Sequence, residues 1–447
     1  MTTLSTARGA RTLRLLSLPV GAAALALEGV ARRARGQDHE VVAQDLRARN
    51  AARTRRVLGE LKGGALKAGQ LLSTVEALFP QDPESTWRDT LAGLQDANPA
   101  LPFAEVEPVL LAEWGSAWRR RFCSFDETAA AAASISQVHR AVWADGREVA
   151  VKVQYPGVRE ALTADVRTLS LMSRAAALVA RGLALPPLVA ELRDRLTEEL
   201  DALHEARTQR TFAQAYAGDP DVVVPGVVHA TPRVLVMDWL DGTPLSVVAR
   251  TGSQAQRDRV AGQYQRFLVS GPARAGLLHT DPHPGNFLSL PDGRLGVLDF
   301  GSSLALPNGM PATFGRLISA LLADDPDEVL RRLREEGFVR AGVEVDVRKL
   351  VDYMAPFSAP ARHDRFRFTR AWLMAEFGRV NDPRNPDFGV ALKLDLPAEH
   401  LFTHRVWLGM VGVLCQLEAE VAVAPVLRTW LPGFDAPQST SPPIEPR

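Results

Sequence analysis

Residues 279–301 constrain the fold of this chain more than any other stretch, and they read HTDPHPGNFLSLPDGRLGVLDFG. Asp281 and Asn286 have the D-x-x-x-x-N spacing of kinase-type phosphotransferases, in which the aspartate lies near the attacking hydroxyl and the asparagine binds metal. Two prolines and a glycine between them exclude a helix, so both side chains can face one cleft. Asp299 ends an apolar strand in an Asp-Phe-Gly sequence, where its carboxylate would bind Mg²⁺ on nucleotide phosphates.

His279 and His283 permit a second interpretation of this loop, because two histidines four residues apart on a helix often bind zinc. The prolines argue against a helix, which makes metal ligation by these side chains the weaker interpretation. A plain structural turn is the third. An Asp-Phe-Gly sequence alone is a weak signal, whereas its position behind H-x-D-x-x-x-x-N favours phosphotransfer.

A strand hairpin with a lysine in it precedes this region. Residues 138–143 and 148–154 alternate between apolar and polar side chains, and the Asp145-Gly146 pair between them is the strongest short hairpin signal. Lys152 lies in the second strand, EVAVKVQ, and a kinase places such a lysine on the α- and β-phosphates. A solvent-facing strand lysine is the alternative.

The lysine of a kinase pairs with a glutamate on a helix, and the segment EELDALHEA holds the candidates. The pattern predicts one helix from Pro187 to Tyr216. Glu198, Asp201 and Glu205 share one face of that helix by their spacing. Glu199 lies off this face. Geometry alone favours Asp201 or Glu205 as the partner, and an exposed acidic face is the alternative.

Two parts of an ordinary protein kinase are missing from the sequence. No G-x-G-x-x-G precedes the lysine strand, and the alanines of 129–133 occupy its place. Alanine still permits a close approach of the backbone to phosphate, with less conformational freedom than glycine. After Gly301 the chain soon enters a helix, without an A-P-E sequence or a long activation segment. A platform for peptide docking is therefore not expected.

Taken together, residues 59–325 resemble the UbiB/AarF family of atypical kinases, and the resemblance continues more loosely to Trp430. The combination of a KxGQ signature with a kinase-like core is highly specific. Four motifs carry the resemblance: KxGQ at 67–70, the alanine-rich loop at 131–139, the ExD element at 199–201, and the two loops that hold Asp281 and Asp299.

The resemblance implies an α+β, two-lobed, protein-kinase-like fold that binds Mg-ATP or Mg-ADP. It implies Asp281 as the catalytic aspartate, a Lys152–Glu205 salt bridge, and Asn286 and Asp299 as metal ligands. It directs Glu199 and Asp201 toward Lys67 and Gln70 of the KxGQ helices, which fold over the site. It assigns further nucleotide contacts to Ala132, Ala133, Ser134, Ile135, Ser136, Gln137, Val138, Met237 and Trp239.

Three positions depart from the family pattern and bear on nucleotide preference. Ser136 stands where the family usually has glycine, Ala202 where a tyrosine often follows the ExD acid, and Thr208 in place of a frequent asparagine. Family members act in isoprenoid quinone biosynthesis and lipid homeostasis, and several are lipid-stimulated ATPases. An ATPase or lipid-directed kinase is therefore favoured. The alternatives are an aminoglycoside- or choline-type phosphotransferase and a non-catalytic nucleotide-binding scaffold.

The first 35 residues are basic, with six arginines against the single acid Glu28. Between them lies an apolar run, residues 15–27, which is too short for the roughly 20 residues of a membrane span. A packing helix, a membrane-surface helix and a signal peptide are the three interpretations. This segment is the candidate for peripheral contact with a membrane. A lipid or quinone precursor is a candidate ligand, and a second copy of the chain is a candidate partner.

Composition sets the remaining limits. The 52 basic and 52 acidic side chains cancel, so no basic excess points to nucleic acid. The two distant cysteines, Cys123 and Cys415, form neither a disulfide framework nor a zinc site, which favours a reducing compartment. We expect a cytoplasmic protein, peripheral on the inner face of the plasma membrane. The predicted layout is a basic segment 1–36, a helical KxGQ extension 37–120, a strand-bearing lobe 121–240, a helical lobe 241–430 and a disordered tail 431–447.

Overall fold

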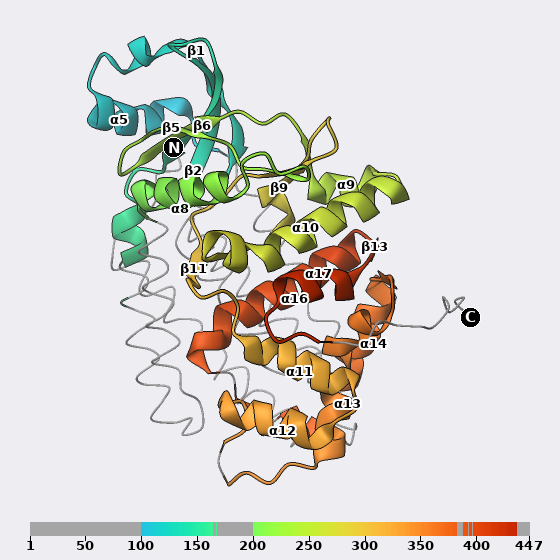
Figure 1. Ribbon diagram of the computed structural model, residues 1–447. Helices are drawn as coiled ribbons and strands as arrows, with labels where there is room; N and C mark the ends of the chain where they lie inside the picture. The colour runs from blue at the N-terminus through green and yellow to red at the C-terminus, as the bar shows by residue number, and fades with distance from the viewer. Residues whose placement is uncertain are drawn as a thin grey trace, which may run out of the picture. The chain divides into compact units, whose positions relative to one another are not determined.

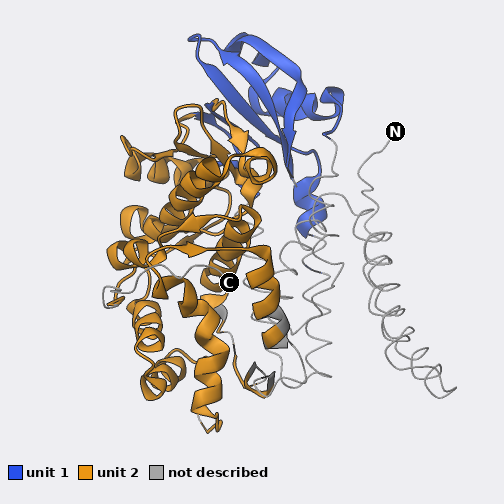
Figure 2. Cartoon of the chain, turned by 90° about the vertical axis from the view of Figure 1, so that its right-hand side faces the viewer, with its two compact units in different colours: residues 1–79, 84–203, 228–238 blue, residues 80–83, 204–227, 239–447 orange. Residues whose placement is uncertain are grey.

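The structure is a computed structural model that describes residues 100–133, 135–163, 167, 200–340, 342–381, 388–391, 393–395 and 397–435. These residues form two compact units, which Figure 2 distinguishes by colour. Unit 1 takes the described residues up to 203 together with 228–238. Unit 2 takes 204–227 and the described residues from 239 onward. Within the described residues, the chain therefore passes from unit 1 to unit 2 twice, after residue 203 and again after residue 238.

Unit 1 is built on a five-stranded sheet with the strand order β1-β2-β3-β6-β5. The β1–β2, β2–β3 and β3–β6 pairs are antiparallel. Helix α5 (Phe103–Trp114) contacts β1 and β3 and buries Val106, Val109 and Leu110. The strands are β1 (Phe122–Ala132), β2 (Ser136–Trp143), β3 (Glu148–Gln154), β5 (Val227–Ala230) and β6 (Val234–Asp238), and a 3-10 helix, η1 (Trp118–Arg121), precedes β1.

The hairpin predicted at Asp145-Gly146 is confirmed. Gly146 has a φ of +90°, a backbone conformation that favours glycine, and its N–H donates to the Trp143 carbonyl over 2.9 Å. The β3 strand buries Val149, Val151 and Val153 completely, as expected of a strand in the middle of a sheet.

The alanine run is a strand as well as a turn. Residues 129–132 form the end of β1, a strand that the sequence analysis did not predict, and Ala132 lies opposite Gln137 on β2. The Ala133 N–H donates to the Ser136 carbonyl over 2.8 Å and closes the turn. Because alanine has little strand preference, only the pairing with β2 makes this stretch extended.

Unit 2 is mainly helical around one long helix, α10 (Gln254–Ala275). Ser253 caps its start by accepting a hydrogen bond from the Gln256 N–H, and Gly276, with a φ of +67°, ends it. Helices α16 and α17 run beside α10 (Figure 1), and their apolar faces share one core. The other helices are α8 (Ala202–Ala215), α9 (Leu245–Thr251), α11 (Ala312–Leu322), α12 (Pro326–Glu335), α13 (Val347–Ser358), α14 (Arg370–Asn381), α15 (Phe388–Ala391), α16 (Leu401–Gln416) and α17 (Val423–Trp430), with 3-10 helices η2 (Pro284–Asn286), η3 (Ala359–Arg362) and η4 (Ala398–His400).

Short strands of unit 2 hold its loops in place. A four-stranded sheet has the order β4-β10-β9-β7, and two further strand pairs are β8–β11 and β12–β13. Strands β9 and β10 pair antiparallel on either side of Gly293. The strands are β4 (Val222–Val223), β7 (Thr243–Pro244), β8 (Leu277–His279), β9 (Phe287–Ser289), β10 (Leu295–Val297), β11 (Ser303–Ala305), β12 (Phe366–Arg367) and β13 (Glu420–Val421).

The helix predicted from Pro187 to Tyr216 is wrong at Asp201. Leu200 and Asp201 are not helical, and α8 begins only at Ala202. The Asp201 carboxylate accepts a hydrogen bond from the Leu203 N–H over 3.0 Å, so Asp201 caps the start of the helix instead of lying within it. The shared helix face that was expected for Asp201 and Glu205 therefore does not exist.

The two ends of the sequence differ in what the structure describes. The basic segment 1–36 lies outside the described residues, as does most of the KxGQ extension. At the other end, residues 431–435 belong to the tail that was predicted to be disordered, but Leu431 and Phe434 are buried in the core of unit 2, so the prediction is wrong for these residues. Among the described residues, no helix combines the length and hydropathy needed to cross a membrane.

Candidate catalytic site

The candidate catalytic loop, residues 280–286, connects β8 to β9 without a helix of more than one turn. His279 ends β8, residues 280–283 are irregular, and a short 3-10 turn ends at Asn286. The Asn286 N–H donates to the His283 carbonyl over 3.0 Å, and the Asn286 carbonyl accepts from the Leu298 N–H over 2.9 Å. The loop is thereby tied to the chain directly before Asp299.

Asp281 and Asn286 lie next to each other and are joined by a hydrogen bond. The Asn286 Nδ2 donates to Asp281 Oδ2 over 2.9 Å and contacts the Asp281 carbonyl oxygen at 3.3 Å. Because the amide nitrogen faces Asp281, the amide oxygen faces the other way. Asn286 can therefore orient the aspartate and offer an oxygen ligand to a cation at the same time.

The two residues that follow Asp299 hold the Asp-Phe-Gly loop in place. Asp299 Oδ1 accepts a hydrogen bond from the Gly301 N–H over 2.9 Å. Phe300 is completely buried, with ring centroids 5.1 Å from Phe212 and 5.6 Å from His279. The phenylalanine therefore anchors the loop in the core of unit 2, which leaves the aspartate beside it half-buried.

His279 supports the Asp-Phe-Gly loop and is not arranged as a metal ligand. Its Nε2 lies 2.5 Å from the carbonyl oxygen of Asp299, and because a carbonyl can only accept, this nitrogen carries the proton. Burial lowers the pKa of His279, so the ring is neutral. His283 accepts from the Gly285 N–H through its own Nδ1 over 3.1 Å. Each ring thus stabilises a turn, which favours the structural interpretation of these two histidines.

Glu205 lies beside the Asp-Phe-Gly loop within unit 2. A Cβ placed on Gly301 would come within 3.7 Å of Glu205 Oε2 and 3.2 Å of Asp299 Oδ1, so the two carboxylates flank this glycine. Glu205 is 4% exposed. Ring contacts of Phe212 with Phe267 and Phe300 fix the helix that carries Glu205 against α10 and the Asp-Phe-Gly loop.

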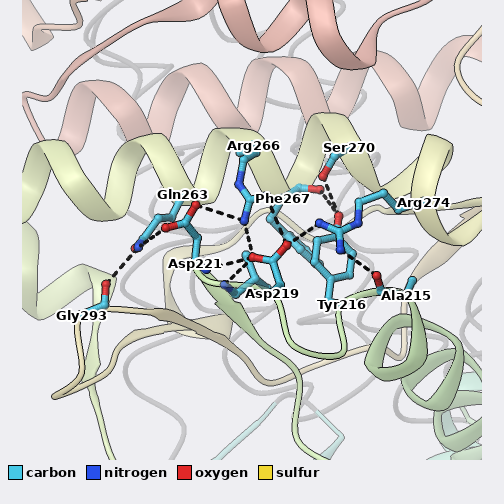
Figure 3. Close-up of polar contacts among 11 residues, drawn as sticks. Ala215, Tyr216, Asp219, Asp221, Gln263, Arg266, Phe267, Ser270, Arg274 and Gly293 are labelled. Carbon is cyan, nitrogen blue, oxygen red and sulfur yellow. Dashed lines mark hydrogen bonds and ion pairs between the residues drawn. The ribbon is translucent and has the colours of Figure 1, made fainter.

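The end of α8 is fastened to α10 by a buried ionic cluster, shown in Figure 3. The Asp219 carboxylate, 3% exposed, pairs with both Arg266 and Arg274 of α10. The Tyr216 hydroxyl lies 2.7 Å from Ser270 Oγ. Burial alone would raise the pKa of Asp219, but hydrogen bonds from the two arginines outweigh burial and hold it below its usual range. The cluster therefore keeps its charge at any ordinary pH.

Several of the predicted nucleotide residues of unit 1 lie on the central strands of its sheet. Lys152 on β3 lies opposite Val138 on β2 and Leu235 on β6, and Met237 follows two residues farther along β6. The Gln137 side chain is engaged by the backbone of Leu101 at 2.8 and 3.2 Å, so only its backbone is suited to contact a ligand. Unit 1 thus brings the lysine and the alanine hairpin onto one sheet.

Other predicted nucleotide residues are only partly described. Ser136 and Ile135 are buried, and the buried Ser136 hydroxyl has no hydrogen-bond partner among the described residues. The Trp239 indole N–H donates to Asp241 over 2.8 Å. Lys152 and Glu205 belong to different units, so their salt bridge stays a prediction. Lys67, Gln70, Ser134 and Glu199 lie outside the described residues.

Sequence reasoning missed the residues that hold the catalytic loop from behind. The buried Tyr264 of α10 donates to the Pro282 carbonyl over 2.7 Å. Burial, with the nearby Asp281 charge, raises the pKa of Tyr264 well above its ordinary value, so the hydroxyl remains a donor. Arg405 of α16 lies 3.5 Å from Asp281 Oδ1. Tyr264 and Arg405 are outside the Asp281–Asn286 motif in the sequence, and no sequence pattern predicts their contact with it.

The oxygen donors of Asn286 and Asp299 suit Mg²⁺, which prefers oxygen and needs only one or two protein carboxylates when substrate phosphates complete its coordination. Within the described residues, no group of three or more histidine, cysteine or acidic side chains could hold a metal ion by itself. This donor set therefore fits a cation that arrives with a nucleotide better than a permanent metal site.

A separate cavity of about 560 Å³ lies elsewhere on unit 2. It is bounded by the start of α10, the turn at Gly293 and Arg365, and none of the residues of the catalytic or Asp-Phe-Gly loops lines it. Figure 3 shows four of its lining residues, Asp221, Gln263, Arg266 and Gly293, joined to one another by polar contacts. This cavity is therefore distinct from the candidate catalytic site.

Comparisons with known proteins show which family this chain resembles. Residues 93–333 match the model of the ABC1 atypical kinase-like domain. The atypical kinase coq-8, mitochondrial, of Caenorhabditis elegans is 31% identical over 305 residues, which cover 67% of this chain and 40% of that protein. The atypical kinase COQ8, mitochondrial, of Saccharomyces cerevisiae is 28% identical over 417 residues, 90% of this chain and 80% of that protein.

A solved structure of Rv3197 from Mycobacterium tuberculosis, in complex with erythromycin, is 38% identical in sequence. It covers 90% of this chain and 100% of its own, with a TM-score of 0.68. This likeness and the family match confirm the α+β, kinase-like fold, with a sheet in unit 1 and a helical unit 2. The chain belongs to the ABC1 atypical kinase family, the family also called UbiB.

Proposed function

We propose that this chain is an ATP-dependent phosphotransferase or ATPase that uses Mg-ATP and serves isoprenoid quinone biosynthesis or lipid homeostasis. The observation that carries the proposal is the 2.9 Å hydrogen bond from Asn286 to Asp281, beside an Asp299 carboxylate held by the Gly301 N–H. This arrangement sets one carboxylate toward an attacking oxygen and leaves two oxygen donors for Mg²⁺.

The proposed reaction transfers the γ-phosphoryl group of ATP. The attacking oxygen, from water or a lipid-like hydroxyl, forms a bond to the γ-phosphorus while the bond to the β,γ-bridging oxygen breaks and ADP leaves. Asp281 positions the attacking hydroxyl and accepts its proton. Lys152, paired with Glu205, holds the α- and β-phosphates. Bound Mg²⁺ would neutralise phosphate charge, with Asn286 and Asp299 as its protein ligands.

A protein acceptor is disfavoured by the short segment behind the Asp-Phe-Gly loop. Ser303 already pairs with His279 in the β8–β11 ladder, and α11 begins at Ala312. Residues 302–311 are too few to form the long activation segment on which protein kinases dock a peptide. A small hydroxyl or water therefore suits this site better.

The proposal also includes roles for the KxGQ residues, for the residues around the nucleotide and for the basic segment. Lys67 and Gln70, with Glu199 and Asp201, gate the site from the KxGQ side. The backbone of residues 132–138, with Met237 and Trp239, surrounds the nucleotide. The basic segment 1–36 makes the peripheral membrane contact, on the inner face of the plasma membrane.

One assay tests the enzymatic part. ATP hydrolysis is measured with and without liposomes that contain anionic lipid, for the wild type, Asp299→Asn and the control Asp292→Asn. Asp292 is an exposed carboxylate paired with Arg294, away from the catalytic loop. We expect turnover that anionic liposomes stimulate, that Asp299→Asn abolishes, and that the control retains. Nucleotide binding without any Asp299-dependent turnover would favour a non-catalytic scaffold.

Binding titrations with the same purified protein test which other ligands it takes. ATP and ADP affinities are compared by titration, because Ser136 replaces a family glycine. Erythromycin is a further ligand to titrate, since the Mycobacterium tuberculosis relative was solved with it. Phosphorylation of choline or an aminoglycoside would instead support a small-molecule phosphotransferase.

A further inference from the structure

Arg405 reaches the catalytic aspartate from a helix that lies 124 residues farther along the chain. It belongs to α16, and its side chain is 17% exposed. Its Nη2 lies 3.5 Å from Asp281 Oδ1. A half-buried arginine beside a half-buried carboxylate interacts in a lower dielectric than water, so even a long contact has electrostatic weight.

The packing of α16 explains how the arginine comes to this place. Gly409 lies so close to the catalytic loop that a Cβ on it would come within 2.4 Å of Pro282 Cγ. Residue 405 is one helical turn earlier and on the same face as residue 409. The glycine therefore lets the helix approach Pro282, and the preceding turn of the helix brings Arg405 to Asp281.

The two oxygens of the Asp281 carboxylate have different neighbours. Oδ2 accepts from Asn286, and Oδ1 faces Arg405. A carboxylate held at one oxygen can still rotate about its Cβ–Cγ bond, whereas a second donor limits that rotation. Holding a catalytic group in one orientation contributes to rate because misaligned states do not react.

We propose that Arg405 is a positioning residue, which holds Asp281 in the orientation that an attacking hydroxyl requires. The role rests on the proposed phosphotransfer function. Residue 405 lies beyond the 93–333 segment that matches the family domain, so the match to that domain does not extend to this residue. Arg405 acts on Asp281 and not on the nucleotide, and this distinction makes the proposal testable.

The first test removes the positive charge of Arg405 and keeps most of the volume of its side chain. We expect Arg405→Met to lower kcat between about 10-fold and 100-fold, the range for losing a charge-assisted hydrogen bond, while KM for ATP changes less than about 3-fold. Arg405→Lys should recover part of kcat. The matched control is Arg332→Met, because Arg332 is 16% exposed and pairs with Glu328 on α12, outside the catalytic loops.

The second test asks whether the arginine acts through the aspartate. In an Asp281→Asn background, adding Arg405→Met should cause almost no further loss of kcat, because the group that it positions is already lost. Gly409→Ala should also lower kcat while Arg405 is intact, because the added methyl pushes α16 away from Pro282. A thermal melt of each variant shows whether it remains folded.

The outcomes separate this proposal from the proposed function. Turnover that depends on Asp299 but is unchanged in Arg405→Met overturns the role of Arg405 alone. A folded Arg405→Met protein with weakened ATP binding and an unchanged kcat also overturns it, because that result places the arginine on the nucleotide. If the losses of kcat caused by Arg405→Met and Asp281→Asn are fully additive in the double variant, the role of Arg405 is overturned as well. Absence of any Asp299-dependent turnover in the wild type overturns the proposed function and this role together.

Discussion

Asn286 donates a 2.9 Å hydrogen bond to Asp281 Oδ2, so the predicted metal ligand is also a support of the predicted catalytic residue. In the sequence these are two separate roles, five positions apart. In the structure one amide group joins them, because its nitrogen faces Asp281 and its oxygen faces away. A substitution at Asn286 should therefore affect both the metal response and the rate.

Asn286→Ala and Asn286→Asp should separate these two effects. The alanine variant loses both, and we expect at least a tenfold lower kcat, about the loss of one charge-assisted hydrogen bond, together with a higher Mg²⁺ requirement. The aspartate variant keeps an oxygen for the cation but places a carboxylate against Asp281, so kcat falls while the Mg²⁺ requirement stays near that of the wild type. Mg²⁺ titrations of ATP hydrolysis measure both quantities. The exposed Asn308→Ala is the control, and an equal Mg²⁺ requirement in all variants would contradict the metal role.

Tyr264→Phe tests the support of the catalytic loop from α10. The hydroxyl is completely buried and donates to the Pro282 carbonyl over 2.7 Å, so its removal leaves that carbonyl without this donor. We expect unfolding free energy to fall by about 1–3 kcal/mol, with a smaller change in kcat than in the Arg405 variants. Chemical denaturation measures the first quantity. Tyr353→Phe, on α13, serves as the control, and equal stability of the two variants would argue against the Tyr264 bond.

Local patterns in the sequence were sufficient where the chemistry is local. The Asp145-Gly146 hairpin depends on a positive φ at one glycine, and the Asp281–Asn286 contact depends on a five-residue spacing. Both signals are contained within a few residues. The sequence therefore predicts the hairpin and the non-helical conformation of the loop between Asp281 and Asn286 correctly.

Features that depend on distant partners were not predictable. The break before α8 is one case, because the Leu200 carbonyl accepts from the Gln154 side chain and the Ala202 N–H donates to the Pro232 carbonyl, and both partners are far away in the sequence. The β12–β13 pair is another, since Phe366 and Val421 meet across 55 residues. The contact of Arg405 with Asp281 is a third example, because nothing in the sequence near residue 405 indicates that α16 packs against Pro282.

Asp219→Asn tests the ionic cluster that fastens α8 to α10. The neutral side chain leaves Arg266 and Arg274 without their shared buried carboxylate, and we expect a loss of about 2–4 kcal/mol in unfolding free energy at pH 7. The folded-state pKa of Asp219 lies below its unfolded value of about 3.9, so this stability is complete above that pH and is lost as the pH falls through the folded value. Urea unfolding at neutral pH and below pH 4 measures the change.

The pH dependence of the stability difference between the wild type and Asp219→Asn tests the ionic origin of this stability most directly. The difference between the wild type and Asp219→Asn should shrink in acid, because protonation of Asp219 produces in the wild type what the substitution produces at pH 7. A difference that stays constant from pH 7 to acid would contradict the ionic origin. The exposed Asp292→Asn should leave stability unchanged at both pH values.

Two glycines of unit 2 should respond oppositely to the same added methyl group. A Cβ on Gly315 of α11 would come within 2.2 Å of the Pro432 carbonyl oxygen and 2.4 Å of the Phe434 nitrogen, which are backbone atoms that cannot easily move aside. A Cβ on Gly262 of α10 meets nothing within 4 Å. We expect Gly315→Ala to lower unfolding free energy by about 1–3 kcal/mol through overpacking. Gly262→Ala should raise it by about 0.5–1 kcal/mol through lower backbone entropy in the unfolded chain.

The Gly315 variant also tests the packing of the last described residues. Phe434 is buried, and the Asp435 N–H donates to Ser319 Oγ over 2.9 Å, so residues 431–435 rest on the face of α11 that contains Gly315. If the alanine displaces them, proteolysis should cut the chain near Leu431 faster than in the wild type or in Gly262→Ala. Limited proteolysis with mass spectrometry detects this cut. Unchanged cleavage together with unchanged stability would show that the tail does not pack on α11 in solution.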